Sequence, residues 1–409
     1  MQIAGIVAEY NPFHNGHLYQ ITQTKVETGC DAVVAIMSGH FSQRGTATIV
    51  DKFTRTKMAL LNGVDLVLEL PVPFATASAE MFAHAAISIL HHSQIIDFIS
   101  FGSECGDISL LDTIAHTFLS YANELDPLIK SHLKQGMSFP RARVHAAISF
   151  LSHFVTPKDR PMLQKTLESP NNILGIEYLK ALRKLDSSMT PFTVKRVNAN
   201  YHDKEITGSI ASATAIRHSI GDKTLEYQHC MPSSASHLLN PNQLPSMEML
   251  AAFLHFKLMF SKQEDLYSLW DIPKDLIRTF IKHSKTAPSY ETLVDRSTSK
   301  TYTRATVQRA LLRILLDIRT EDINPFITQA PLPYIRVLGC RKDAISVLRL
   351  LSNKSHVPLI TNLGKQYNAL NPTQKQFIDY ELRATKLYHY LVHQPPFFTQ
   401  DFTQPFILI

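Results

Sequence analysis

Apolar runs and segments of helical periodicity alternate along the first half of the chain. Four short apolar runs, closed by polar, Pro or Gly residues, predict buried strands at residues 2–8, 31–37, 64–70 and 95–101. The segments between them predict helices at residues 17–27, 51–61 and 78–91. This alternation predicts βαβ units and a mainly parallel sheet, and such sheets bind ligands at the carboxyl ends of their strands. We therefore expect the turns at residues 11–16, 38–45 and 102–106 to converge on one edge of the sheet.

The rest of the pattern is mainly helical. Residues 108–190 predict a helical insertion, residues 192–197 a strand, and Ser209 the start of another helix. Beyond residue 240 we expect helices at residues 247–260, 305–318, 337–351 and 373–392, with a Pro-containing connection at 325–333. The expected fold is α/β: a Rossmann-like parallel-sheet domain at residues 1–220, with the insertion at about 108–190, followed by a mainly α-helical domain at residues 221–409.

Composition and charge narrow the class of protein. Hydrophobic residues make up 44% and charged residues 19%, and neither a run of about 18 apolar residues nor a signal peptide stands out, so we expect a cytoplasmic protein without a membrane span. The four cysteines are scattered, which argues against a zinc knuckle or a disulfide framework. Residues 1–220 carry 19 Lys and Arg against 19 Asp and Glu, so the net charge of +6 falls entirely in residues 221–409. This asymmetry hints at a polyanionic partner, although ordinary surface charge also explains it.

The segment His14-Asn15-Gly16-His17 carries the first chemical signal, because it lies at the expected turn from strand to helix. Two histidines three residues apart can face one place there, and Gly16 lets the backbone approach a ligand closely. Helix N–H groups and imidazole donors would then stabilise charge on a pentacovalent α-phosphate. A capped helix with two surface histidines is the plainer interpretation. A zinc site needs further ligands, which no nearby residue supplies, so we expect no metal site in the protein itself.

Placed after the first strand, this segment resembles the HxGH motif of the nucleotidylyltransferase superfamily. That superfamily includes pantetheine-phosphate and nicotinate-mononucleotide adenylyltransferases and class I aminoacyl-tRNA synthetases. Its second motif, of ISSTxIR type, is similar to residues 210–217, with Ala at two of the small positions. The resemblance implies that Ser212 and Thr214 cap a helix that faces the triphosphate, and that Arg217 supplies charge to the β- and γ-phosphates. Without the first motif, a plain Ser/Thr-capped helix would be the better interpretation.

Longer stretches resemble one family, the bacterial tRNA(Met) cytidine acetate ligases. They span nearly the whole chain and weaken after about residue 360; they are residues 5–17, 37–45, 51–55, 63–71, 101–104, 169–175, 201–203, 302–304 and 334–339. The resemblance implies an enzyme with two steps. Acetate and ATP, accompanied by Mg²⁺, give acetyl-adenylate and pyrophosphate. The N4 amine of the wobble cytidine of elongator tRNA(Met) then attacks the acetyl carbon, which gives N4-acetylcytidine and AMP.

The resemblance also implies roles for particular residues in ATP binding. His14 and His17 would grip the α-phosphate, Gly102 would let backbone approach the adenosine, and Arg196 would contact phosphate. The side-chain amide of either Asn171 or Asn172 suits a sugar or base edge. Residues 197–200 depart from the Gly-containing form that the family carries before residues 201–203. The remaining expected ATP-binding residues are Val7, Ala8, Glu9, Tyr10, Asn11, Pro12, Phe13, Asn15, Gly16, Ser212, Thr214 and Arg217.

Acetate and RNA need cations of their own. A buried carboxylate needs a paired cation, and we expect Arg44 and Lys52 to supply it, although most of the basic residues nearby are equally well explained as solvated. Asp51 is either a helix cap or a general base. Arg309 and Arg313, four residues apart, would share a helix face opposite an apolar stripe and suit RNA phosphates. The expected RNA surface also includes Lys300, Arg304, Arg336 and Arg341, and its alternative is a solubilising surface.

Two other functions remain open at this stage. A small-molecule adenylyltransferase of cofactor synthesis would need little beyond the sheet domain, which would leave the basic helical half without a role. A non-enzymatic RNA-binding protein with a degenerate nucleotide site is disfavoured, because His14, Gly16, His17 and Arg217 are all present.

Overall fold

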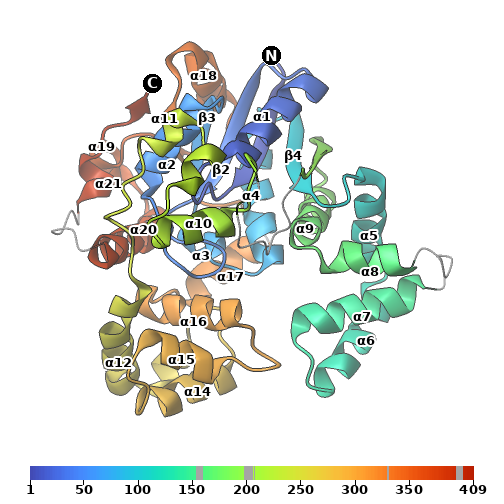
Figure 1. Ribbon diagram of the computed structural model, residues 1–409, viewed down its shortest axis with the longest axis vertical. Coiled ribbons are helices and arrows are strands. Elements are labelled where there is room, and N and C mark those ends of the chain that lie inside the picture. The colour runs from blue at the N-terminus through green and yellow to red at the C-terminus, as the bar shows by residue number, and fades with distance from the viewer. Residues whose placement is uncertain (153–159, 198–205, 207, 329–330, 393–398) are drawn as a thin grey trace.

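The computed structural model describes residues 1–152, 160–197, 206, 208–328, 331–392 and 399–409 (Figure 1). Its centre is one sheet of eight strands in the order β5-β4-β1-β2-β3-β6-β7, with β8 paired to β6. All pairs are parallel except β3 with β6. The strands are β1 (Ile3–Ala8), β2 (Ala32–Ser38), β3 (Leu66–Leu70), β4 (Phe98–Ser103), β5 (Thr190–Lys195), β6 (Ile335–Cys340), β7 (Leu359–Ile360) and β8 (Ile407–Leu408).

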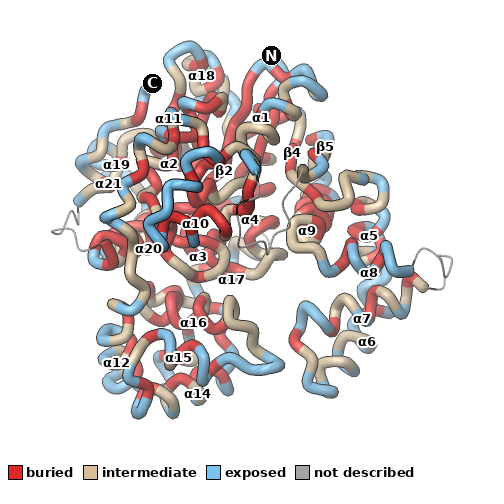
Figure 2. The backbone as a smooth tube through the Cα atoms, in the orientation of Figure 1, coloured by how far each residue is buried: buried red, intermediate tan, exposed pale blue. Residues whose placement is uncertain are grey.

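Helices cover both faces of the sheet, which explains the continuous apolar strands (Figure 2). In β2, Val34 and Ile36 point into one core while Ala35 and Met37 point into the other. The first core is covered by α4 (Ala79–Ser93) and α9 (Pro170–Lys184), and the second by α1 (Asn15–Thr28), α2 (Lys52–Leu61) and α10 (Ala213–Gly221). The prediction of a Rossmann-like parallel sheet is therefore confirmed.

Local sequence signals account for the helix starts in this domain. The carboxylate of Asp51 accepts the N–H groups of Phe53 and Thr54, so Asp51 is the N-cap of α2. Ser78 caps α4 in the same manner. Short helices α3 (Val72–Ala75) and α11 (Ser233–Ser236) complete this part. No helix among the described residues is long and apolar enough to cross a membrane.

Two helical lobes hang from the sheet domain (Figure 1). The insertion expected at about residues 108–190 forms the first lobe and then leads into α9. Its helices are α5 (Ile108–Ser120), α6 (Ala122–Lys134), α7 (Phe139–Leu151) and α8 (Arg160–Glu168). The second lobe comes from the C-terminal half. Its helices are α12 (Leu250–Phe260), α13 (Gln263–Tyr267), α14 (Lys274–Ser284), α15 (Tyr290–Ser297) and α16 (Arg304–Leu316). The next helix, α17 (Thr320–Thr328), packs against α4 of the sheet domain.

The chain then returns to the sheet, which corrects the helix expected at residues 337–351. Residues 335–340 form β6 instead, and the α-helix α18 (Ile345–Lys354) begins only after a short 3-10 turn at Lys342–Ala344. Periodicity does not distinguish a strand from a buried helix in a short apolar run, which is why the pattern assigns residues 337–340 to a helix. Strands from both sides of residue 220 therefore belong to one sheet, and the division expected there runs through the sheet domain. The last helices are α19 (Leu363–Gln366), α20 (Pro372–Leu391) and α21 (Gln400–Thr403).

Candidate active site

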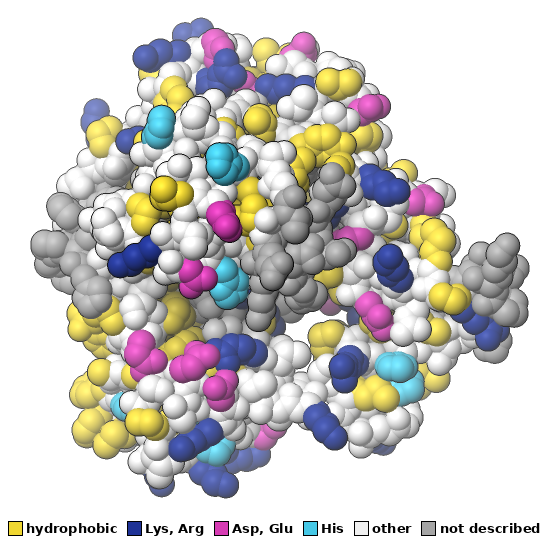
Figure 3. Space-filling view, viewed as in Figure 1, with side chains coloured by type: hydrophobic (Ala, Val, Ile, Leu, Met, Phe, Trp, Pro, Cys, Tyr) yellow, Lys and Arg dark blue, Asp and Glu magenta, His cyan; other side chains and the backbone are white. Residues whose placement is uncertain are grey.

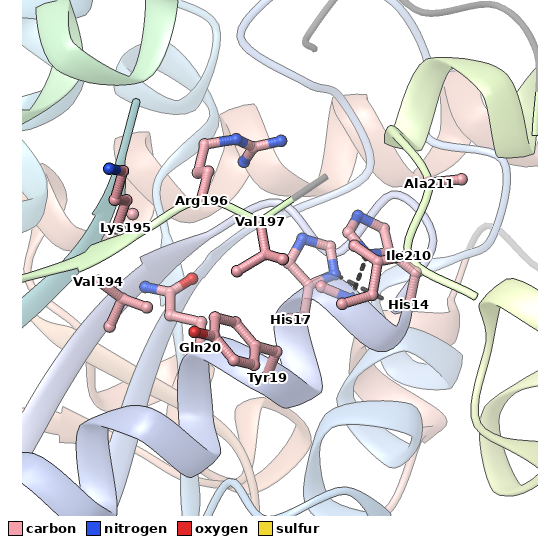
Figure 4. A pocket seen from close by; sticks show the side chains of 12 residues that line it. His14, His17, Tyr19, Gln20, Val194, Lys195, Arg196, Val197, Ile210 and Ala211 are labelled. Carbon is pink, nitrogen blue, oxygen red and sulfur yellow. Dashed lines mark hydrogen bonds between the residues drawn. The ribbon is translucent and has the colours of Figure 1, made fainter. Parts of the chain in front are cut away.

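A pocket lies where the carboxyl ends of β1, β4 and β5 meet the start of α1 (Figure 4). From β1 the sheet continues to β2 and β3 on one side and to β4 and β5 on the other, and α/β sheets bind ligands at such a switch point. The residues that line the pocket are His14, Gly16, His17, Tyr19, Gln20, Gly102, Val194, Lys195, Arg196, Val197, Ile210 and Ala211.

His14 and His17 cap the N-terminus of α1 with their own imidazole rings. The Nδ1 atom of His14 accepts the N–H of Gly16 at 3.1 Å, and the Nδ1 atom of His17 accepts the N–H of His14 at 3.2 Å. The two rings stack with their centroids 3.7 Å apart. Because Nδ1 is the acceptor in both rings, each neutral imidazole carries its proton on Nε2 and offers that atom as a donor.

Both imidazoles are held in the neutral form. Burial, reinforced by Arg196 and Arg217, lowers the pKa of His14 to about 3. Burial, together with His14 and Arg196, also holds the pKa of His17 well below its usual value. Two neutral N–H donors are therefore available to phosphate oxygens near neutral pH, and neither imidazole has to release a proton or a counter-ion first.

This burial makes the stability of the fold pH-dependent through His14. The unfolded ring titrates at about pH 6.5 and the folded ring at about 3, so between these values the unfolded state binds the extra proton. Stability is thus complete above pH 6.5 and is lost as the pH falls, by about 2 kcal/mol at pH 5. We expect His14→Asn to remove this dependence. When the pH is lowered from 7.5 to 5, the free energy of unfolding of the variant should therefore rise by about 2 kcal/mol relative to that of the parent. Urea unfolding midpoints at both pH values measure it, and parallel pH curves for the two proteins would contradict it.

Position 16 needs a glycine because the ring of His14 fills the space that a side chain would occupy, whether or not a ligand is bound. A Cβ atom at Gly16 would lie 2.9 Å from Cε1 of His14, which is too close for any side chain. At Gly102 a Cβ atom would meet Cγ of Arg196 at 3.7 Å, an ordinary contact. Both glycines line the pocket, but only Gly16 is demanded by the packing of the protein itself.

The second motif packs directly against the first. Ser212 is the N-cap of α10, and its hydroxyl accepts the N–H of Ala215 at 3.0 Å. The guanidinium of Arg217 donates to the carbonyl oxygen of Asn11 at 2.8 Å and to the hydroxyl of Thr214 at 3.1 Å. Thr214 therefore orients Arg217, while Ser212 alone is the N-cap. The fold brings the two motifs together although about 200 residues separate them.

The residues between β1 and His14 mostly support the pocket from beneath. The rings of Tyr10 and Phe13 are buried and pack against His17, with centroids 4.9 and 5.6 Å away. The side chain of Asn15 donates to the carbonyl oxygen of Ser209 at 2.8 Å, a further tie between the motifs. Of the ATP-binding residues expected in this segment, those that do not line the pocket are Val7, Ala8, Glu9, Tyr10, Asn11, Pro12, Phe13 and Asn15.

Arg196 reaches the pocket from the end of β5 (Figure 4). Its backbone N–H donates to the carbonyl oxygen of Ser103 at 2.9 Å, while its side-chain Nε is buried and has no acceptor among the described residues. A buried donor that lacks an acceptor costs free energy, and an anionic ligand would supply the acceptor. The pocket therefore fits a phosphate group chemically.

Asn172 is a poor candidate for nucleotide contact because it is 1% exposed and its amide oxygen and nitrogen both bond inside the protein. Its Oδ1 accepts the N–H groups of Glu104 and Cys105 at 2.9 and 3.2 Å, and its Nδ2 donates to the carbonyl oxygen of Thr166 at 3.2 Å. The carboxylate of Glu104 in turn accepts the N–H of Asn172 and the side-chain amide of Asn171. Of the two asparagines, the partly exposed Asn171 remains the candidate.

Lys52 lies in a closed ion cluster and not in the pocket. Its Nζ is 2.7 Å from Oε1 of Glu69 and 2.7 Å from Oδ1 of Asp401, and the side chain is 0% exposed. The guanidinium of Arg336 pairs with the same two carboxylates at 2.9 and 2.7 Å. These four side chains are the buried ion cluster. The expectation that Lys52 binds acetate is wrong, because both its carboxylate partners belong to the protein.

Arg44 sits in a turn that links the nucleotide motif to α16. The N–H of the neighbouring Gln43 donates to the carboxylate of Glu9 at 2.7 Å. Gly45, at φ +78°, packs so closely on α16 that a Cβ atom would lie 2.5 Å from the backbone nitrogen of Arg309. Arg44 itself is partly exposed and remains a candidate for binding a carboxylate.

The basic face expected on α16 does not exist as predicted. Arg313 is buried, pairs with Asp271 at 3.1 Å, and donates to the carbonyl oxygen of Thr76 at 3.0 Å. Its guanidinium also lies over the ring of Trp270. Helices α12, α15 and α20 all pack around α16, so both the apolar stripe and the opposite face are covered.

The other expected RNA-binding residues divide into three groups. Arg336 belongs to the buried ion cluster, and its placement on an RNA surface is wrong. Arg304 and Arg341 are ion-paired with neighbouring carboxylates. Lys300 is exposed and Arg309 is partly exposed, and neither forms an ion pair with any described residue.

Some pocket residues escaped the sequence reasoning. Gln20 follows His17 by three residues and so shares its face of α1, a signal that helical periodicity contained. Tyr19 and Lys195 carry no motif that would single them out, while Ile210 begins the stretch that resembles the second motif. The stretch at residues 201–203, which helped to suggest the family, lies outside the described residues.

Comparisons with known proteins agree with this geometry. Residues 1–403 match the family model described as HIGH Nucleotidyl Transferase. The chain is 36% identical to a tRNA(Met) cytidine acetate ligase of Acetivibrio thermocellus and 38% identical to that of a Thermoanaerobacter species, and each alignment covers 100% of both chains. Crystal structures of Thermotoga maritima TmcAL, 30% identical and covered in full, superpose with TM-scores of 0.91 for the apo form and 0.88 for the form bound with alpha-thio ATP.

Proposed function

Since the chain belongs to the HIGH nucleotidyl transferases and, within them, to the family of tRNA(Met) cytidine acetate ligases, we propose that it joins acetate to a tRNA cytidine at the expense of ATP. The product is N4-acetylcytidine at the wobble position of elongator tRNA(Met). The observation that carries this proposal is the pair of neutral imidazole donors, flanked by Arg196 and Arg217, at the switch point of the sheet.

In the first step, an acetate oxygen attacks the α-phosphorus of ATP. The bond from that phosphorus to the oxygen bridging to the β-phosphate breaks, and pyrophosphate leaves with the electron pair. The Nε2–H groups of His14 and His17 donate to the α-phosphate oxygens as charge builds up there. Arg196 and Arg217 neutralise the triphosphate. Acetate is already ionised near neutral pH, so this step needs no general base.

In the second step, the N4 amine of cytidine attacks the acetyl carbon of acetyl-adenylate. The bond from that carbon to the phosphate oxygen breaks, AMP leaves with the electron pair, and the amine loses a proton. Arg44, partly exposed in the turn next to Glu9, is our candidate for holding the acetate carboxylate before activation. A cytidine in a loop is easily unstacked to reach the pocket.

Mg²⁺ would enter with ATP, held mainly by phosphate oxygens. Within the described part of the chain, no group of three or more His, Cys, Asp or Glu side chains is placed to hold a metal ion. The pocket instead presents imidazole and guanidinium donors, which suit the phosphates of the nucleotide.

The proposal predicts acetate-dependent ATP–pyrophosphate exchange in the absence of RNA. With labelled acetate, ATP and total tRNA, we expect label to enter the tRNA as N4-acetylcytidine. The competing function, a small-molecule adenylyltransferase, would show exchange driven by pantetheine phosphate or nicotinate mononucleotide and none driven by acetate. That result would refute the proposed function. Label that appears in tRNA only when ATP is present would support it.

A further inference from the structure

The first helical lobe carries an unusual run of charge. Residues 127–152, which include most of α6 and all of α7, contain four Lys and Arg residues and no Asp or Glu. Arg143 pairs with Glu177 and lies over the ring of Phe118, so it belongs to the interior of the lobe. Lys130, Lys134 and Arg141 are exposed, and within the described chain none of the three has an ion pair or hydrogen bond.

These three cations contrast with the cations first expected to bind RNA. Arg313 is buried beside Asp271, and Arg304 is paired with two carboxylates. A positive side chain that already has a protein carboxylate contributes little to a phosphate contact, because the pair must first be broken. Unpaired and exposed cations release counter-ions on binding RNA and gain the full electrostatic attraction.

The position of these cations points to the same partner. The parallel strands run from the end of the molecule where the N-terminus lies toward the two lobes, so their carboxyl ends face the space between the lobes (Figure 1). The space-filling view shows the molecule hollowed there, with Lys, Arg and His side chains on the visible face of the first lobe (Figure 3). The turn from α6 to α7, residues 135–138, lies at the end of this lobe that borders the hollow (Figure 1).

An exposed aromatic residue lies in the same stretch of chain as the cations. Phe139 begins α7, directly after the turn, and is 53% exposed. Aromatic rings next to cations are the usual equipment of proteins that bind single-stranded or looped RNA, because bases stack on the ring while the cations contact phosphates.

We propose that Lys130, Lys134 and Arg141, with Phe139, form a contact surface for the RNA substrate on the first lobe. The RNA enters the hollow between the lobes with its target nucleotide toward the pocket and its phosphates against α6 and α7. The proposal rests on the proposed function in taking tRNA as the substrate. It moves the main RNA contact from the C-terminal half to the insertion.

The test is a triple variant, Lys130→Ala/Lys134→Ala/Arg141→Ala, in the full chain. We expect kcat/KM for tRNA acetylation to fall at least about tenfold, and the slope of log affinity against log salt to become shallower by about two to three. Acetate-dependent pyrophosphate exchange should stay at the parental rate, because it needs no RNA. Phe139→Ala should weaken tRNA binding by itself, with the salt slope unchanged.

A matched control removes the same charge elsewhere. Arg278, Lys282 and Lys285 are exposed cations on and just after α14, at the far end of the second lobe (Figure 1). Their triple Ala variant should bind and acetylate tRNA like the parent. Parental tRNA binding by the α6–α7 variant, or an equal loss in the α14 control, overturns the proposal. If the parent lacks acetate-dependent exchange, the proposed function fails, while direct binding of labelled tRNA to the same variants still decides where RNA is held.

Discussion

His14→Asn is expected to lower acetate-dependent ATP–pyrophosphate exchange by about 10²–10³-fold while leaving the fold as stable as the parent at neutral pH. The His14 ring has two separable roles. Its Nδ1 caps α1 by accepting the N–H of Gly16, and its Nε2 is left as a donor in the pocket. Asn is among the best N-cap residues, so the variant keeps the cap and loses only the donor.

His14→Ala is the companion variant. It should lose the same activity and, in addition, about 1 kcal/mol of stability, because Ala removes the cap as well. Pyrophosphate exchange and urea unfolding at pH 7.5 separate the two effects. If His14→Asn keeps exchange within a few-fold of the parent, the imidazole is only a cap, and the role in stabilising the α-phosphate must be given up.

Lys52→Met should destabilise the protein by about 3–5 kcal/mol. Lys52 is fully buried, and its removal leaves the carboxylates of Glu69 and Asp401 with Arg336 as the only cation of the buried ion cluster. Burial alone would raise the pKa of Asp401, yet Lys52 and Arg336 hold it well below its usual value. The lost stabilisation is measured by urea unfolding followed by circular dichroism.

Two further variants make the Lys52 result specific. Lys57→Met changes an exposed lysine on the same helix and should cost no more than about 0.5 kcal/mol. Lys52→Met/Asp401→Asn restores neutrality to the cluster and should recover part of the loss. A Lys52→Met protein that unfolds like Lys57→Met but lacks acetate-dependent exchange would return Lys52 to the acetate site and refute its structural role.

The buried ion cluster also shows why the C-terminal end of the chain matters to the sheet domain. Asp401 in α21 joins Lys52 in α2, Glu69 in β3 and Arg336 in β6. Gly39, directly after β2, packs tightly on the buried ion cluster, since a Cβ atom would lie 3.0 Å from Oε1 of Glu69. The turn that carries Arg44 therefore starts from a position that the last residues of the chain help to hold.

The sequence by itself determined the features that depend on near neighbours. Alternating apolar runs produced the parallel sheet, Asp51 and Ser78 marked helix starts, and HxGH after the first strand marked the pocket. These signals are local because strand burial, helix capping and a strand-to-helix turn each involve residues close together in the chain.

Only the tertiary structure decided which charged and polar side chains are free to act. Lys52, Arg313 and Arg336 look like available cations in the sequence, but each meets a carboxylate that lies far away in the chain or on another element. Asn172 likewise accepts a hydrogen bond from the backbone N–H of Glu104, 68 residues earlier. Spacing places a side chain on a face of its own helix or strand, whereas its partners depend on which other element packs there. That is why the place of the first motif at the pocket could be predicted, while the burial and pairing of Lys52, Arg313 and Arg336 could not.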